Sequence, residues 1–256
     1  MILRCLALLI CLNLALPAVA QDVLILGEVH DNPVHHAVQA ARVATLQPQA
    51  IVFEMLTENQ AALITPDRRS DEAALAKTLE WDKSGWPDFS MYYPIFAAAP
   101  EAKIYGAQVT RDTSRAVLEV GLVAVFDADA ARYGLGRELT QTEQTAREAL
   151  QMEAHCDALP EDLLPGMVAI QRLRDAVLAR SVVQAMEATG GPVAVITGNG
   201  HARRDWGVPA YLAEVAPDLE VWVLGQTEED AGLEGDFDEV TSAPAVERPD
   251  PCAAFQ

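Results

Sequence analysis

Short apolar segments recur along the chain at intervals that predict the strands of a sheet. They are rich in Val, Ile, Leu and Ala, and most run continuously apolar instead of alternating with polar residues. Continuous apolar runs of this length are typical of parallel strands that are buried on both faces. We expect five such strands, at residues 23–26, 50–54, 103–108, 193–197 and 220–224.

The segment between the first two expected strands has the spacing of a helix. Val34, Val38, Ala41 and Thr45 recur at helical intervals, and Pro48 ends the pattern. A strand, a helix and a second strand at this spacing form a β-α-β unit, which places the two strands parallel in one sheet. The sequence therefore predicts an α/β fold, with a mostly parallel β-sheet flanked by helices.

Two long segments, residues 57–100 and 113–189, have helical patterns broken by turns. The expected helices cover residues 58–64, 71–79, 92–99, 113–120, 141–153 and 165–189. We expect these segments to form an inserted helical lobe over the carboxyl edge of the sheet, where open α/β folds bind their ligands. The acidic, Pro-rich tail after Gly225 predicts a β-ribbon or coil.

The first twenty residues have the pattern of an export signal. Arg4 precedes an apolar stretch over residues 5–16, and Ala18-Val19-Ala20 offers small residues for cleavage. The stretch is shorter than the ~20 residues that a membrane-spanning helix needs. We expect cleavage before Gln21 and an exported, periplasmic protein of one domain over residues 21–256. An N-terminal membrane anchor is the alternative.

A lipid anchor does not fit this N-terminus. Residue 21 is Gln and not Cys, and Cys11 lies within the apolar stretch instead of after it. Removal of the signal leaves Cys156 and Cys252, and two cysteines in an exported chain fit one disulfide. Two free thiols are the alternative, with Cys156 as a ligand.

The composition limits the partners of the protein. Half of the residues are hydrophobic, enough for a large core, and the formal net charge is −20. Nucleic acid and anionic membrane surfaces repel such a chain, so we expect neither as a partner and no stable membrane insertion. The sequence has no GxSxG, GxGxxG or Walker motif, and it therefore gives no sign of those nucleophile and nucleotide sites.

Titratable side chains follow three of the expected strands. Glu28 and His30 follow the first, Glu54 ends the second, and His201 follows the fourth. Because carboxyl ends of parallel strands share one edge, we expect these four side chains to lie together. Two histidines and two carboxylates would suit Zn²⁺, Mn²⁺ or Fe²⁺ with open positions for water. For Glu54, the alternative is a solvated strand end.

Further polar residues occur in the helical segments. His155 ends a helix, where the helix dipole favours a histidine even without a ligand. Gln171, Arg174 and Asp175 form a polar stripe on the following helix, either exposed or lining a cleft. Arg111 follows the third strand at the same sheet edge.

Together these segments resemble the ChaN-like family of the haem-binding uptake and Tiki-like superfamily. The resemblance extends in order over nearly the whole expected mature chain. Its residues are Gly27-Glu28-Val29-His30-Asp31-Asn32-Pro33-Val34-His35-His36, Glu54-Met55, Trp81 with Trp86-Pro87, Arg111, His155-Cys156, Gln171 with Arg174-Asp175, and Gly198-Asn199-Gly200-His201-Ala202 with Gly207-Val208-Pro209.

The resemblance implies an exported protein that binds haem and is linked to iron and haem acquisition. Family members are often lipoproteins, and this chain departs by lacking a lipobox. Haem binding in the family looks like Tyr ligation with His nearby, and it allows a homodimer. Tyr92 and Tyr93 are the candidate ligands, whereas Tyr105 lies in an expected strand. A phenolate is a known ligand of haem iron.

Two functions follow from these residues. The first is a haem-binding protein without turnover, with haem contacts expected from His30, His155, His201, Tyr92, Tyr93, Arg111 and Arg174. An apolar slot at residues 81–96 and an anchor from Arg111 or Arg203 would hold the porphyrin. The alternative is a metal-dependent hydrolase of peptides or esters. More distant superfamily members are hydrolases with similar segments, and Glu28 or Glu54 would then act as general base on a metal-bound water.

Overall fold

The fold is a six-stranded, all-parallel sheet covered by helices on both faces. The computed structural model describes residues 21–229, 231–250 and 252–253; the expected signal at residues 1–20 lies outside them. The strand order is β3-β2-β4-β1-β5-β6. The strands are β1 (Val23–Leu26), β2 (Ala50–Phe53), β3 (Lys103–Gly106), β4 (Val193–Ile196), β5 (Val221–Glu228) and β6 (Glu239–Ala243).

The predicted α/β class and parallel sheet are confirmed, since β1 pairs with β4 and β5, and β2 pairs with β3 and β4, all in parallel. The main helices are α1 (Pro33–Leu46), α2 (Glu58–Ala62), α3 (Glu72–Thr78), α4 (Phe89–Ala98), α5 (Arg111–Val120), α6 (Leu122–Phe126), α7 (Gln141–Ala154), α8 (Leu164–Thr189), α9 (Asn199–Ala202) and α10 (Val208–Val215). Short 3₁₀ turns lie at Pro66–Ser70, Trp81–Lys83 and Glu161–Leu163. Among the described residues, no helix is both long and apolar enough to span a membrane.

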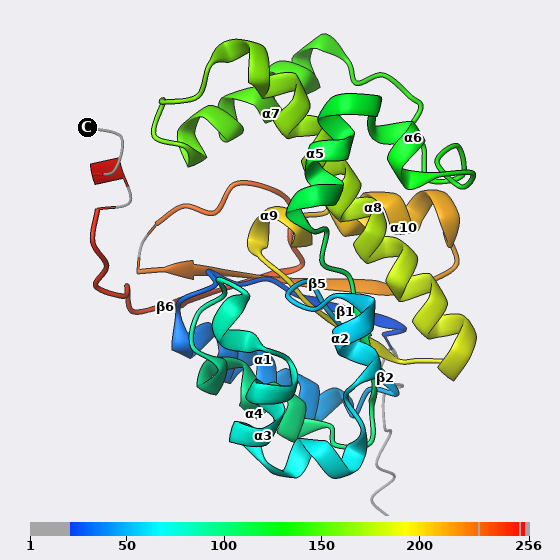
Figure 1. The fold of residues 1–256 in the computed structure, drawn as a ribbon, viewed down its shortest axis with the longest axis vertical. Helices are drawn as coiled ribbons and strands as arrows, with labels where there is room; N and C mark the ends of the chain where they lie inside the picture. The colour runs from blue at the N-terminus through cyan, green and yellow to red at the C-terminus, as the bar shows by residue number, and fades with distance from the viewer. Residues whose placement is uncertain (1–20, 230, 251, 254–256) are drawn as a thin grey trace, which may run out of the picture.

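The helical segments lie on opposite faces of the sheet, instead of in one lobe (Figure 1). Alternate residues of each strand face two separate cores. Ile25, Val52 and Val195 pack with α5, α6, α8 and α10, whereas Leu26 and Phe53 pack with the segment from α2 to α4. Because the strands are apolar on both faces, both faces need a cover of helices. The helices α7 and α8 still reach the carboxyl edge of the sheet, where they border the cavity described below.

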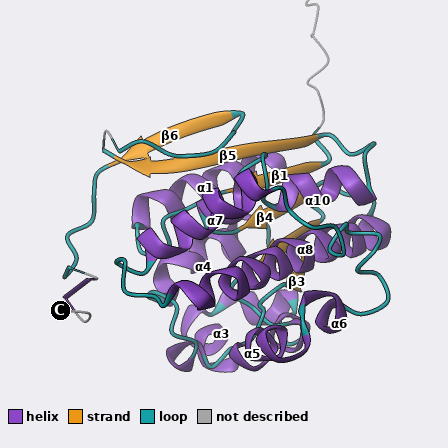
Figure 2. Cartoon of the chain, turned by 90° about the horizontal axis from the view of Figure 1, so that it is seen from above, coloured by secondary structure: helices purple, strands orange, loops and turns teal. Residues whose placement is uncertain are grey.

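The C-terminal segment contains an edge strand that the strand predictions omitted. A β-ribbon would run antiparallel, but β6 pairs parallel with β5, and Figure 2 shows the two strands together along one side of the molecule. Residues 231–238 return along β5 before β6 begins. Leu233 and Phe237 cover Gly225 in this return, since a Cβ at Gly225 would lie 2.5 Å from Leu233 and 2.9 Å from Phe237. The lack of a side chain at Gly225 therefore lets the return segment lie against the sheet.

Candidate functional site

The strand order brings three βα junctions together at the carboxyl edge. Strand β4 lies between β1 and β2, so the residues that follow these strands are neighbours in space. Gly198 lies at the centre of this group: a Cβ placed on it would be 3.0 Å from His30 Nε2 and 3.9 Å from Glu54 Oε2. The lack of a side chain at Gly198 therefore lets the His30 ring approach the backbone between β4 and α9 this closely.

Glu28 is a buried carboxylate with four polar neighbours. His30 Nδ1 lies 2.7 Å from Oε1, and the Tyr92 hydroxyl donates to the same oxygen at 3.0 Å. Gln39 Nε2 donates to Oε2 at 2.7 Å, and His36 Nδ1 lies 3.4 Å from it. A buried charge is tolerated when it is paired and hydrogen-bonded in this way. This carboxylate therefore holds β1, α1 and α4 together.

Glu54 is held in the same manner on the other side of Gly198. Its Oε2 accepts hydrogen bonds from Thr197 Oγ1 at 2.7 Å and from Gly198 N at 2.9 Å. His201 Nε2 lies 3.6 Å from Oε1, and His201 Nδ1 lies 2.6 Å from Asp175 Oδ1. Burial raises the pKa of Glu54, but the charges of His201 and His30 and these hydrogen bonds outweigh burial and lower its pKa to about 2.

The carboxylates favour the protonated forms of the two histidines. Burial lowers the pKa of His30, but the hydrogen bond to Glu28 and the charge of Glu54 raise it to about 9. Burial also lowers the pKa of His201, and the charges of Glu54 and Asp175 reverse the effect and raise it. A protonated imidazole has no lone pair for a metal, so these carboxylates oppose metal binding by the two rings.

The four expected metal ligands form two ion-paired units instead of one cage. Glu28 pairs with His30, and Glu54 pairs with His201. Within the described ranges, no group of three or more His, Cys, Asp or Glu side chains is arranged to hold a metal ion. The donor set therefore does not fit a resident divalent metal in this arrangement, although the residues are those that the sequence indicated.

Both candidate tyrosines point into the protein. Tyr92 is fully buried, its hydroxyl bonds to Glu28, and burial together with that carboxylate raises the pKa of its phenol. The Tyr93 hydroxyl donates to the Arg69 carbonyl at 2.9 Å. Both phenols are therefore engaged within the helical cover formed by α2 to α4. The expected slot at residues 81–96 is likewise filled, since Trp81, Phe89 and Tyr92 pack against one another.

A cavity of about 610 Å³ lies beside this edge, between α7, α8, α9 and residues 232–234. The apolar part of the cavity wall is formed by Leu150, Val168, Trp206 and Leu233. Its polar rim includes His201 and Asp175 from the ion-paired group, together with Arg147 and Arg203. The two guanidinium groups lie over the Trp206 ring, with centroid distances of 5.0 Å for Arg147 and 3.7 Å for Arg203.

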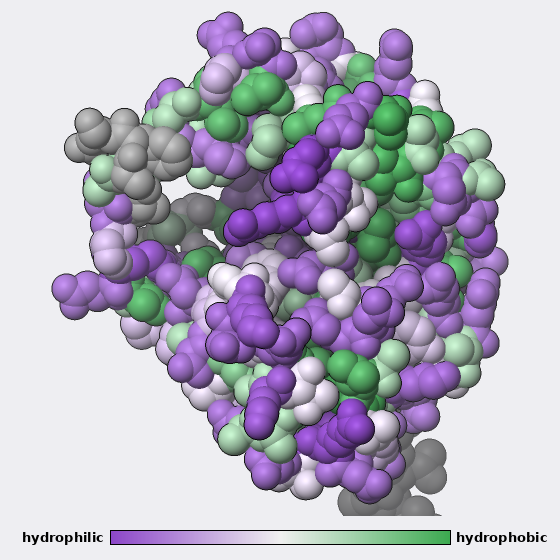
Figure 3. Space-filling view, in the orientation of Figure 1, coloured by the Kyte–Doolittle hydropathy of each residue, from purple (hydrophilic) through white to green (hydrophobic). Residues whose placement is uncertain are grey.

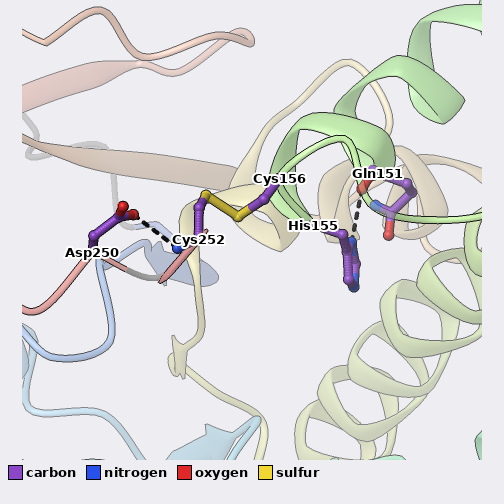
Figure 4. The surroundings of a disulfide bond; sticks show 5 residues. All are labelled: Gln151, His155, Cys156, Asp250 and Cys252. Atoms are coloured by element: carbon purple, nitrogen blue, oxygen red, sulfur yellow. Dashed lines mark hydrogen bonds between the residues drawn. A yellow bond between two sulfur atoms is a disulfide. The ribbon is translucent and has the colours of Figure 1, made fainter. Parts of the chain in front are cut away.

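His155 lies at the end of α7, next to the confirmed disulfide between Cys156 and Cys252 (Figure 4). Its Nδ1 lies 2.7 Å from the carbonyl oxygen of Gln151, a residue that lines the cavity. A nitrogen this close to a carbonyl oxygen carries the proton, which leaves the lone pair of the neutral ring on Nε2. No hydrogen bond engages that second nitrogen within the described part of the chain.

Comparison with known proteins identifies the family. The family model described as haem-binding uptake, Tiki superfamily, ChaN matches residues 15–212. The chain belongs to this ChaN family. Among solved structures, "Cofacial heme binding to ChaN of Campylobacter jejuni" aligns over 84% of each chain at 19% identity and a TM-score of 0.63. The type III effector HopBA1 aligns over 88% of each chain at 12% identity and a TM-score of 0.45. Comparison with curated proteins found no match.

In this ChaN-family chain, two expected haem contacts lie away from the cavity. Arg111 and Arg174 line a separate groove between α5 and α8. Conversely, the sequence analysis did not select Arg147, Trp206 or Leu233, which border the cavity. Arg147 lies on a helix rich in charged residues, and Leu233 lies in a coil, so no local pattern distinguishes them. The return of residues 231–238 along β5 brings Leu233 to this place.

Proposed function

We propose that this protein is an exported haem-binding protein of haem and iron acquisition, and that haem occupies the cavity beside His201. The observation that carries the proposal is the cavity itself, in a member of a family described by haem binding. Its volume of about 610 Å³ falls within the ~300–1,000 Å³ typical of small-molecule sites. Apolar walls with a few convergent polar groups suit a porphyrin.

Arg147 and Arg203 are suited to anchor the two haem propionates. A guanidinium has five donors. Arg203 donates hydrogen bonds from Nε and Nη2 to the two carboxylate oxygens of Asp205, at 2.6 Å each. The remaining donors of its planar guanidinium group can pair with a further carboxylate. Trp206, beneath both arginines, offers a flat aromatic face to a macrocycle.

His155 does not line the cavity itself but directly follows the lining residues Glu153 and Ala154 at the end of α7, and it is our candidate for the iron ligand. When bound, haem supplies an iron that accepts an axial nitrogen or oxygen donor. The carboxylates beside His30 and His201 favour the protonated forms of these rings, whereas the Nδ1 contact of His155 leaves Nε2 to bind. An imidazole whose second nitrogen donates to a backbone carbonyl is the usual arrangement of a metal-binding histidine. The Tyr ligation that the family resemblance implies would require Tyr92 or Tyr93 to leave the present contacts.

Export is supported by the pairing of Cys156 with Cys252. Disulfides persist in oxidising compartments such as the periplasm and are rare in reducing ones. The signal pattern in residues 1–20 agrees with this location. A homodimer remains an expectation of the resemblance, and light scattering with and without hemin tests it.

Hemin titration of the oxidised protein tests the proposal. We expect a Soret band that saturates at one hemin per cavity. His155→Ala should shift the band and weaken binding, whereas Tyr93→Phe, a control outside the cavity, should leave it unchanged. The proposed function fails if the parent protein gives no Soret band. The proposed ligand fails if the spectrum of His155→Ala equals that of the parent.

The same samples test the hydrolase alternative. A metal-dependent hydrolase would retain Zn, Mn or Fe after purification, and chelation would stop its hydrolysis of an ester or peptide. Stoichiometric metal together with chelator-sensitive turnover, and no hemin binding, would replace the proposal by this alternative. Glu54→Gln should then abolish the activity if Glu54 is the general base.

A further inference from the structure

A second groove lies between α5 and α8, at a distance from the ion-paired histidines. We call it the α5–α8 groove; it has a volume of about 310 Å³ and is bordered by Arg111, Ser114, Leu118, Met167, Ile170 and Arg174. It combines cationic and apolar side chains within one concave surface. The haem proposal assigns it no role, and the inference below does not rest on that proposal.

The apolar part of the groove extends onto an exposed surface. Leu118 is 53% exposed, and Val120 and Val123 beyond it are 63% and 47% exposed. Figure 3 shows a hydrophobic area over α5 and α6, bordered by strongly hydrophilic surface. Leu118 lies over Gly166, since a Cβ at Gly166 would be 2.4 Å from Leu118 Cδ2. Contiguous exposed apolar surface of this kind marks interaction sites on soluble proteins.

The cationic part of the groove is unusual for this chain. The net charge is −20, yet Arg111, Arg115 and Arg174 border one groove. Arg115 Nη1 is paired with Asp112 at 3.1 Å, and Arg174 Nη1 donates to the Gln171 side chain at 3.2 Å. The Arg111 side chain forms no hydrogen bond or ion pair with any residue that the structure describes.

Two further observations point to an anionic ligand. Arg111 is the first residue of the ten-residue helix α5, where the positive end of the helix dipole disfavours a cation. A bound anion would remove that repulsion and would also meet helix N–H groups. The Ser114 hydroxyl oxygen, one turn further along, is buried without a hydrogen-bond partner in the described structure. A buried hydroxyl of this kind costs free energy unless a ligand or water satisfies it.

We propose that the α5–α8 groove binds a medium-chain amphiphilic anion, with its carboxylate against Arg111 and Arg174 and its alkyl chain along Leu118, Met167 and Ile170. At ~30 Å³ for each heavy atom, a volume of about 310 Å³ accommodates on the order of ten atoms. Octanoate has this size. The groove is too small for a porphyrin, so its ligand differs from that of the cavity.

Octanoate binding, followed by calorimetry and by methyl NMR, tests the proposal. We expect shifts of the Leu118 and Ile170 methyl signals, and smaller or no shifts of Leu150 and Val168 in the cavity. Lengthening the probe from hexanoate to octanoate should tighten binding up to about tenfold, and longer chains should gain little because the groove is full. Octanol and acetate should each bind at least tenfold more weakly than octanoate.

Variants separate the groove from nonspecific binding. Arg111→Gln and Arg174→Gln should each weaken octanoate binding about tenfold or more, because each removes a charge-assisted hydrogen bond. Arg68→Gln, an exposed arginine on the opposite face of the sheet, is the control and should have no effect. The proposal is wrong if octanol binds as tightly as octanoate. It is also wrong if both groove variants bind octanoate as tightly as the parent protein does. Binding only to anionic vesicles, with none to octanoate, would assign the surface to a membrane instead.

Discussion

The disulfide gives the sharpest test of how the C-terminal segment is held. Cys156 follows α7 and Cys252 lies after β6, 96 residues along the chain. The bond therefore ties the tail that follows an edge strand to the end of α7, and Figure 4 shows the two cysteines joined. Replacing both residues in Cys156→Ser/Cys252→Ser opens this loop and leaves no free thiol.

The expected loss of stability follows from the loop length. In the chain-entropy model, a cross-link that closes a loop of roughly 100 residues stabilises the folded state by about 4–5 kcal/mol. Arg248 binds Asp31 and Glu228 with N···O distances of 2.7–2.8 Å. We expect these contacts to hold the tail in the double variant, so that the loss reflects mainly the opened loop. At ~2–4 °C for each kcal/mol, the melting temperature should fall by roughly 10–15 °C.

Guanidinium denaturation of the oxidised parent and the double variant measures this difference. Arg248→Gln is the control, since it removes ion pairs of the same tail without opening the loop and should cost about 1 kcal/mol. A double variant within about 1 kcal/mol of the parent would refute the loop-entropy reasoning. A loss equal to that of Arg248→Gln would show that only local tail contacts matter.

Three further predictions concern the sheet edge. Tyr92→Phe should lower the free energy of unfolding by ~1–3 kcal/mol in chemical denaturation, because a buried carboxylate loses a donor; no change would contradict that role. Gly198→Ala should displace the His30 ring and alter its NMR titration, since the added Cβ would lie 3.0 Å from Nε2, whereas Gly200→Ala meets nothing within 4 Å and is the control. The pKa of Glu54 is lowered from 4.5 to about 2, so its contribution to stability is complete above pH 4.5 and is lost as the pH falls towards 2. Glu54→Gln should flatten acid denaturation in that window, and an unchanged pH profile would contradict the assignment.

The sequence was sufficient for the parts of the fold that local patterns determine. Five short, mainly apolar runs became five parallel strands, and the three central strands β1, β2 and β4 are buried at every residue. Strand β6 was not predicted from the sequence, because Glu239–Ala243 has alternating exposure at the sheet edge and no apolar run. Burial of the strands on both faces was expected from their continuous apolar runs, but helical periodicity does not specify which helices cover which face of the sheet.

The candidate site shows the same division between features that local sequence patterns determine and features that depend on distant contacts. Glu28, His30, Glu54 and His201 follow strands directly, so the parallel topology brings them to one edge as the sequence indicated. Their protonation could not be predicted, because it depends on partners far along the chain. Asp175 on α8 holds His201, and Tyr92 on α4 helps to hold Glu28. These contacts turn an expected metal-ligand set into two buried ion pairs.

The residues that carry the family resemblance mainly hold the sheet edge together. A Cβ on Gly27 would lie 2.5 Å from Asn199 Oδ1, and Asn199 in turn bridges to the backbone of Gln226 on β5 through both its side-chain oxygen and its side-chain nitrogen. Gly207 approaches the His201 carbonyl, where a Cβ would be 2.3 Å from the oxygen. These packing and hydrogen-bonding duties explain why the motif residues identify the fold. The cavity walls on α7 and at residues 232–234 lie outside these motif residues, whereas Gln171, Asp175 and His201 on the other walls belong to them, so the motif specifies only part of the cavity.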